Sequence, residues 1–228
     1  MSLKIRENVD IEQKIAAASD FNSSYILLMA TAGVLSAVAL LTNSVPVLIG
    51  SMVIAPAFPP LALVAVGLVY QRMNLVRDGA ISAGLGLGIA ISAALITAWL
   101  LNITNVLPEE AELLNRQLLQ ERVSPGWYSV VTAIAAGIAG MVALIERKTD
   151  TLVGVVAALA LVPAGVAGAI AFLSKDPIRG WGGMALLAIN VGLIVASGAA
   201  TLWFFEPIND FEKKDPNAEK ELKQEHES

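Results

Sequence analysis

Residues 45–70 read VPVLIGSMVIAPAFPPLALVAVGLVY, a run with no charged side chain and with three prolines near its middle. About 20 apolar residues in a helix cross the ~30 Å hydrocarbon layer of a bilayer, so this run is long enough to span a membrane. Pro56, Pro59 and Pro60 each remove a backbone N–H, at a cost of about 3 kcal/mol in a helix interior. The stretch therefore predicts a membrane helix that breaks across residues 55–60.

Five further apolar runs lack Asp, Glu, Lys, Arg and His, and they cover residues 25–41, 79–103, 127–145, 152–173 and 181–205. The chain is 56% hydrophobic and 15% charged, whereas about 25% of residues are charged in a typical soluble domain. These values exclude an ordinary soluble enzyme, a disordered chain and a nucleic-acid binder, which needs a basic surface. We predict an all-α integral membrane protein with six transmembrane helices.

The distribution of basic residues predicts the orientation of these helices. If all six runs cross the membrane, eleven Lys and Arg residues fall on one side and four on the other. The basic side is usually cytoplasmic, so both termini are expected in the cytoplasm of a prokaryote, with the chain in its cytoplasmic membrane. If the second and fifth runs dip in and return, the split becomes nine against six, which is a weaker asymmetry.

The two halves of the chain align when the sequence is shifted by 103–104 residues. Leu48-Ile49-Gly50 then meets Leu152-Val153-Gly154, Pro59 meets Pro163, and Tyr25 meets Tyr128. A unit of three spans repeated in series reverses its direction in the membrane, which is the inverted arrangement of many transporters. The predicted segments are an N-terminal cytoplasmic stretch (1–24), a first repeat (25–103), an outer connecting loop with a short surface helix (104–126), a second repeat (127–205) and a charged cytoplasmic tail (206–228).

A helix break within the bilayer exposes backbone N–H and C=O groups that must face protein or a wet cavity. The new helix beyond the break presents a positive end, which attracts anions. Broken helices at matching places in two repeats indicate a transport site. We therefore expect a solute path along eight residues: Ser51, Ala55, Pro56, Phe58, Pro59, Pro60, Pro163 and Asn190.

Several of these residues admit two interpretations. The hydroxyl of Ser51 either serves the break or bonds a carbonyl of its own helix. A single membrane proline such as Pro163 often only bends a helix, and Asn190 either ties two helices together or contacts a solute. Gly84 and Gly88 have the spacing of close helix contacts, within the chain or with a second copy, so we expect a homo-oligomer.

The second span also carries a family resemblance. Residues 51–60, SMVIAPAFPP, resemble the small-Met-x-Ile-(Ser/Ala)-Pro-x-x-Gly-Pro motif of the prokaryotic family called Domain of Unknown Function 389, with Pro59 in place of the glycine. Leu161-Val162-Pro163 is similar to a second family segment, Leu-x-Pro-Pro, with Ala164 in place of the last proline. The resemblance covers about residues 23–205 and implies a polytopic membrane protein without assigning an activity.

Two functional hypotheses follow. The first is a transporter or channel for a small anion or neutral polar solute, because the spans lack the ionisable groups that proton relays and many cation carriers use. The second is a scaffold that binds a partner through its charged tails. We expect no enzymatic activity, metal or cofactor, since the chain has no cysteine and its single histidine, His226, lies in the tail. No nucleic-acid partner is expected, and the lipid bilayer is the surrounding medium.

Overall fold

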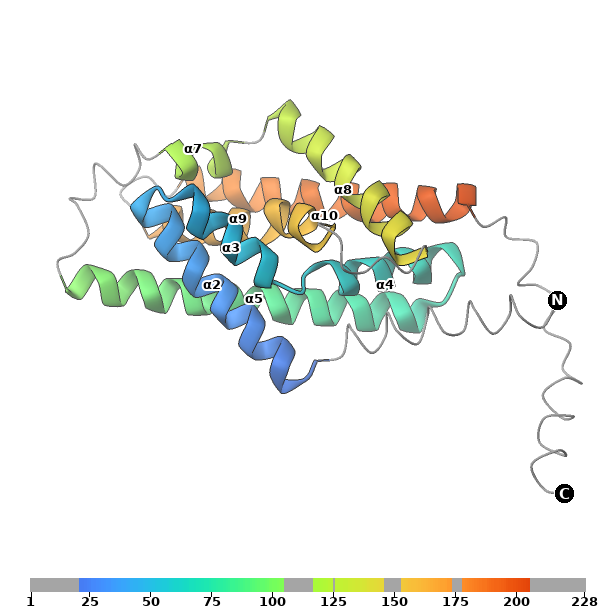
Figure 1. Cartoon of the computed structure of the whole chain (residues 1–228), viewed down its shortest axis with the longest axis horizontal. Coiled ribbons are helices and arrows are strands. Elements are labelled where there is room, and N and C mark those ends of the chain that lie inside the picture. Colours follow the sequence, from blue (N-terminus) through green and yellow to red (C-terminus); the bar gives the residue numbers. More distant parts are fainter. Residues whose placement is uncertain (1–20, 105–116, 125, 146–152, 174–177, 206–228) are drawn as a thin grey trace, which may run out of the picture.

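The structure is a computed structural model that describes residues 21–104, 117–124, 126–145, 153–173 and 178–205 (Figure 1). Every regular element in these ranges is a helix. The elements are α2 (Ser23–Thr42), α3 (Val45–Ile54), α4 (Phe58–Val69), α5 (Met73–Ile103), α7 (Gln117–Val123), α8 (Trp127–Ile145), α9 (Val153–Phe172) and α10 (Ile178–Phe205).

Four of these helices, α2, α5, α8 and α10, are long and apolar enough to cross a bilayer. The bent pair α3 and α4 adds a fifth candidate if the pair forms one span. The described helices therefore indicate a multi-pass helical membrane protein. The remaining expected span, 152–173, corresponds to α9, and α7 lies within the outer loop (104–126) that was expected to contain a short surface helix.

The break predicted in the second span is present at residues 55–57, where α3 and α4 meet at 51°. Ala55 leaves the helix with φ −70° and ψ 116°, as expected for a residue that precedes a proline. The new helix begins at Phe58, so the break is shorter than the expected range of 55–60. The prolines fit there because N–H groups in the first turn of a helix have no partner to lose.

Pro163 does not interrupt its helix. The sequence predicted a break or kink in the fifth span, but α9 continues through Pro163 without a break. A single proline removes one backbone hydrogen bond, and neighbouring groups in a membrane bundle can compensate for that loss. The three clustered prolines of the second span remove more bonds than one turn can replace, which explains the different outcome.

Glycines bring the helices unusually close together. Gly33 of α2 lies against the carbonyl of Ala90 in α5, and Gly137 of α8 lies against the carbonyl of Ile194 in α10. A second pair of contacts joins Gly79 to the carbonyl of Pro60, and Gly183 to that of Ala164. Gly137 and Ile194 lie 104 residues after Gly33 and Ala90. In the same way, Gly183 and Ala164 lie 104 residues after Gly79 and Pro60. Small residues of this kind let helix backbones approach closely in membranes.

The arrangement of the helices has the same regularity. The first helix of each half packs on the third, α2 on α5 and α8 on α10, and α9 packs on α10 as α4 packs on α5. In Figure 1, α5 (green) and α10 (orange to red) run in opposite directions. The two halves thus use the same pairings while their third helices are antiparallel.

Gly84 and Gly88 have no role in the packing within the described chain. Both are exposed, and no atom lies within 4 Å of a Cβ added at either position. The helix contact is made instead by Gly86, which faces the side chain of Tyr25. A contact of Gly84 and Gly88 with a second copy of the chain stays a prediction.

We expect Gly33→Ala and Gly137→Ala to lower the free energy of unfolding by about 1–3 kcal/mol, because the added methyl group meets a backbone carbonyl that cannot rotate away. Thermal unfolding in detergent measures the effect. Gly192→Ala is the matched control and should be neutral or slightly stabilising, because Gly192 is exposed, no atom lies within 4 Å of a Cβ added there, and alanine favours a helix by up to about 1 kcal/mol. Equal destabilisation by all three substitutions would contradict this assignment of the contacts.

Candidate functional site

The helix break lies inside the protein. Ala55, Ala57 and Phe58 are each about 95% buried. The ring of Phe58 packs against Gly140 of α8, where a larger side chain would collide with it. A small gap beside Ala57, lined also by Leu161 of α9, has no room for a water molecule. In this conformation the polar groups of the break therefore face protein.

The hydroxyl of Ser51, one turn before the break, makes two hydrogen bonds. Its hydroxyl donates to the carbonyl of Leu48 in its own helix at 2.7 Å, and it accepts a hydrogen bond from the hydroxyl of Ser36 at 3.0 Å. Both serines are fully buried. Of the two interpretations left open by the sequence, bonding within its own helix applies, and the additional contact ties α3 to α2.

The expected solute-path residues fall in two places. Six of them, Ser51, Ala55, Pro56, Phe58, Pro59 and Pro60, lie at or beside the break because they belong to α3, α4 and the link between them. Pro163 lies two residues after Leu161, which borders the break from α9. Asn190 lies apart from them, in the wall of a separate cavity.

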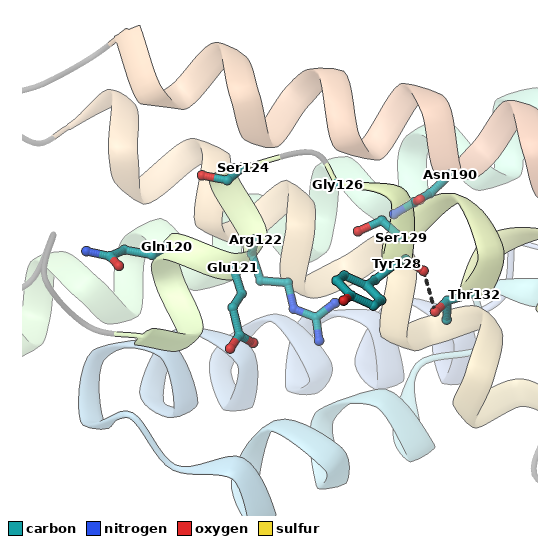
Figure 2. Close-up of a pocket in the computed structure, with 9 residues that line it drawn as sticks. All are labelled: Gln120, Glu121, Arg122, Ser124, Gly126, Tyr128, Ser129, Thr132 and Asn190. Carbon is teal, nitrogen blue, oxygen red and sulfur yellow. Dashed lines mark hydrogen bonds between the residues drawn. The ribbon is translucent and has the colours of Figure 1, made fainter.

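This second site is a cavity of about 830 Å³ between α7, α8 and α10, called here the α7–α8–α10 cavity (Figure 2). Among the described residues, its wall is rich in polar side chains and includes Gln120, Glu121, Arg122, Ser124, Gly126, Tyr128, Ser129, Thr132 and Asn190. Asn190, in the middle of α10, is only 1% exposed. The cavity thus leads from the short helix α7 to a buried amide within a candidate membrane span.

Arg122 brings a positive charge to this cavity. Burial lowers the pKa of its guanidinium, and the neighbouring Glu121 carboxylate opposes that shift. The group is a cation at neutral pH, because arginine is not deprotonated in proteins. Figure 2 shows the Glu121 carboxylate lying away from Ser129 and Thr132, and its Oε1 accepts a hydrogen bond from Gln117 Nε2 at 3.1 Å.

Helix α7 is held over the cavity by contacts with the core. Leu118, Leu119 and Val123 are buried, and α7 packs on α9 and α10. The backbone N–H of Leu118 donates to the side-chain oxygen of Asn43 at 3.1 Å. Asn43 ends α2 with φ 55° and ψ 38°, a left-handed conformation that asparagine tolerates better than most residues. The turn between α2 and α3 therefore positions the helix that carries Arg122.

Sequence reasoning found Asn190 but missed the residues around it. Arg122, Ser124, Tyr128 and Ser129 follow one another within eight residues, across the end of the expected surface helix and the start of the next span. That local cluster of one cation and three hydroxyls was the available signal. Among the described residues, no group of three His, Cys, Asp or Glu side chains lies close enough together to hold a metal ion.

A family model described as Domain of unknown function (DUF389) matches residues 52–196, which is more than half of the chain. The chain belongs to this family. The matched region begins at Met52, just before the helix break, and extends past Asn190, so it includes both sites described above. Comparisons with curated proteins and with solved structures give no match. Membership in the DUF389 family brings no assigned activity.

We expect the buried serines to be energetically coupled. In a double-mutant cycle of Ser36→Ala and Ser51→Ala, the coupling free energy should be about 0.5–1.5 kcal/mol, the usual net value of one hydrogen bond. Unfolding in detergent measures each variant. Thr31→Ala combined with Ser92→Ala is the control, because these exposed hydroxyls bond carbonyls of their own helices and should be additive. If the two substitutions are additive, the hydrogen bond between Ser36 and Ser51 does not stabilise the fold.

Proposed function

We propose that this DUF389 protein is a membrane transporter or channel for a small solute, an anion or a neutral polar molecule. The observation that carries the proposal is the helix break between α3 and α4, which is buried in the interior of an apolar helical bundle. A break of this kind costs a helix several hydrogen bonds and stabilises nothing by itself. Interrupted helices inside membrane proteins are typical of solute and ion sites.

The proposal includes six spans in two inverted three-helix repeats, with both termini in the cytoplasm. The glycine–carbonyl contacts that recur after 104 residues support the repeat. The antiparallel course of α5 and α10 in Figure 1 supports the inversion. Ala57 and Leu161, which are themselves 104 residues apart, line the same gap. Residues that meet their own counterparts lie near the axis relating two repeats, so this axis would pass close to the break.

The described conformation would then be a closed one. The gap at Ala57 excludes water, and the ring of Phe58 fits against Gly140. Transporters with inverted repeats open by rocking one bundle against the other around a fixed site. Here, sliding of α4 along α8 at the contact of Phe58 with Gly140 would admit a solute to the break. The absence of charged residues from the apolar runs disfavours a proton relay.

The remaining expectations are part of the same proposal. The protein would lie in the cytoplasmic membrane of a prokaryote, act without enzymatic chemistry, and form a homo-oligomer through the exposed face of α5 that includes Gly84 and Gly88. The alternative, a scaffold that acts through its charged tails, concerns residues 1–24 and 206–228, of which only 21–24 lie within the described ranges. No contact of the described helices favours it.

Solute flux into proteoliposomes tests the transport function. We expect flux of nitrate, phosphate, glycerol or urea to exceed that of potassium, and the Pro56→Ala/Pro59→Ala/Pro60→Ala variant to lose at least 90% of it by closing the break. Pro46→Ala is the matched control, because Pro46 lies in the first turn of α3, away from the break. It should retain flux.

Two outcomes would count against this account. Potassium-selective flux would move the site to the free carbonyls of the break. No flux above that of empty liposomes, from protein shown to be folded, would favour the scaffold.

A further inference from the structure

The two halves of the molecule differ at one pair of equivalent positions. In the first half, the side chain of Tyr25 is 96% buried, lies against Gly86, and donates a hydrogen bond from its hydroxyl to the carbonyl of Ser82 at 3.0 Å. The 104-residue register of the glycine contacts pairs Tyr25 with Ser129 and Gly86 with Asn190. The first half thus has a large side chain over a glycine, and the second has a small hydroxyl beside an amide.

This exchange accounts for the position of the cavity. Ser129 and Asn190 both line the α7–α8–α10 cavity, at the place where a phenol ring fills the first half. The sequence alignment had paired Tyr25 with Tyr128, one residue earlier. Tyr128 is 91% exposed and lies at the rim of the cavity, so it does not fill the space that Tyr25 fills. The positions that form a closed helix contact in the first half, Tyr25 and Gly86, therefore correspond to residues that line an open polar cavity in the second half.

We propose that the α7–α8–α10 cavity binds a small oxyanion between Arg122 and the hydroxyl and amide groups around Ser129 and Asn190. Guanidinium groups recognise the oxygens of carboxylate, phosphate and sulfate groups with paired N–H donors. Ser124, Tyr128 and Ser129 add hydroxyl donors, and Asn190 adds an amide at the buried end. The partly buried position of the charge strengthens its attraction for an anion, because the surroundings screen it less than water does.

The charges of the wall disfavour cations. Arg122 repels a cation, and the Glu121 carboxylate lies away from Ser129 and Thr132 in Figure 2. The hydroxyl of Thr132, which also lines the cavity, already donates to the carbonyl of Tyr128 at 2.8 Å, so the donors for an anion are the other polar groups of the wall. The volume of about 830 Å³ suits a small anion together with water.

This site goes beyond the proposed function, since it is separate from the helix break, and only a part of the site in transport rests on that function. Since Asn190 lies in the middle of α10, an anion bound there would be within a candidate span. The same chemistry fits two sources, a soluble oxyanion and the phosphate of an anionic lipid headgroup. Binding to the full-length protein in detergent can be measured without any flux, so the two proposals can fail separately.

The test is calorimetric titration of the purified full chain in a nonionic detergent with sodium phosphate, sulfate and acetate, and separately with phosphatidylglycerol. We expect at least one of these probes to bind, and Arg122→Gln to weaken it at least tenfold. Arg77→Gln is the matched control, because Arg77 is exposed at the start of α5 and does not line the cavity. It should bind as the unaltered protein does.

A second variant copies the closed half of the molecule into the open one. Ser129→Tyr with Asn190→Gly recreates the pairing of Tyr25 with Gly86, so it should fill the inner end of the cavity, lower affinity at least tenfold and leave the melting temperature within a few degrees. Binding only of phosphatidylglycerol, lost in both variants, supports the site and assigns its source to lipid. No binding of any probe, or binding that survives both variants, overturns the proposal.

Discussion

The close approach of helix backbones at glycines is the constraint on which the rest of this structure depends. Inside a bilayer, burial of apolar surface does not drive helices together, because lipid tails are as apolar as leucine. Helix association then depends on close packing and on polar contacts. Gly33 on the carbonyl of Ala90, and Gly137 on that of Ile194, set the distance between the first and third helix of each half. The remaining helices are arranged around these two crossings.

The broken helix can exist only within that frame. Its unsatisfied backbone groups cannot face lipid, so the surrounding helices must enclose them. Two close contacts enclose the break. Gly140 of α8 packs against the ring of Phe58, and Leu161 of α9 lies beside Ala57. The hydroxyl pair of Ser36 and Ser51 fixes α3 to α2 just before the break. The enclosure also explains why the break can be stable without water beside it.

The sequence was sufficient for features set by local chemistry. Three prolines within five residues fix the position of a break, and charge-free runs of about 20 residues fix the helices, because neither depends on distant partners. The sequence was insufficient for features that depend on contacts between helices distant in the chain. Pro163 has the same chemistry as Pro59, yet α9 continues through it. Gly84 and Gly88 have the spacing of a contact, but within the described chain Gly86 between them makes it, against the side chain of Tyr25. The cavity around Asn190 could not be predicted for the same reason, because it depends on which side chain faces Asn190 from α8.

Cysteine labelling tests the inverted repeat most directly, since the natural chain has no cysteine. Single cysteines would replace Thr42 and Ile145 at the ends of α2 and α8, and Tyr70 and Leu173 at the ends of α4 and α9. A membrane-impermeant maleimide is then applied to intact and permeabilised cells. The account predicts that Thr42 and Leu173 react from outside, and that Ile145 and Tyr70 react only after permeabilisation. Labelling of Thr42 and Ile145 from the same side would contradict it.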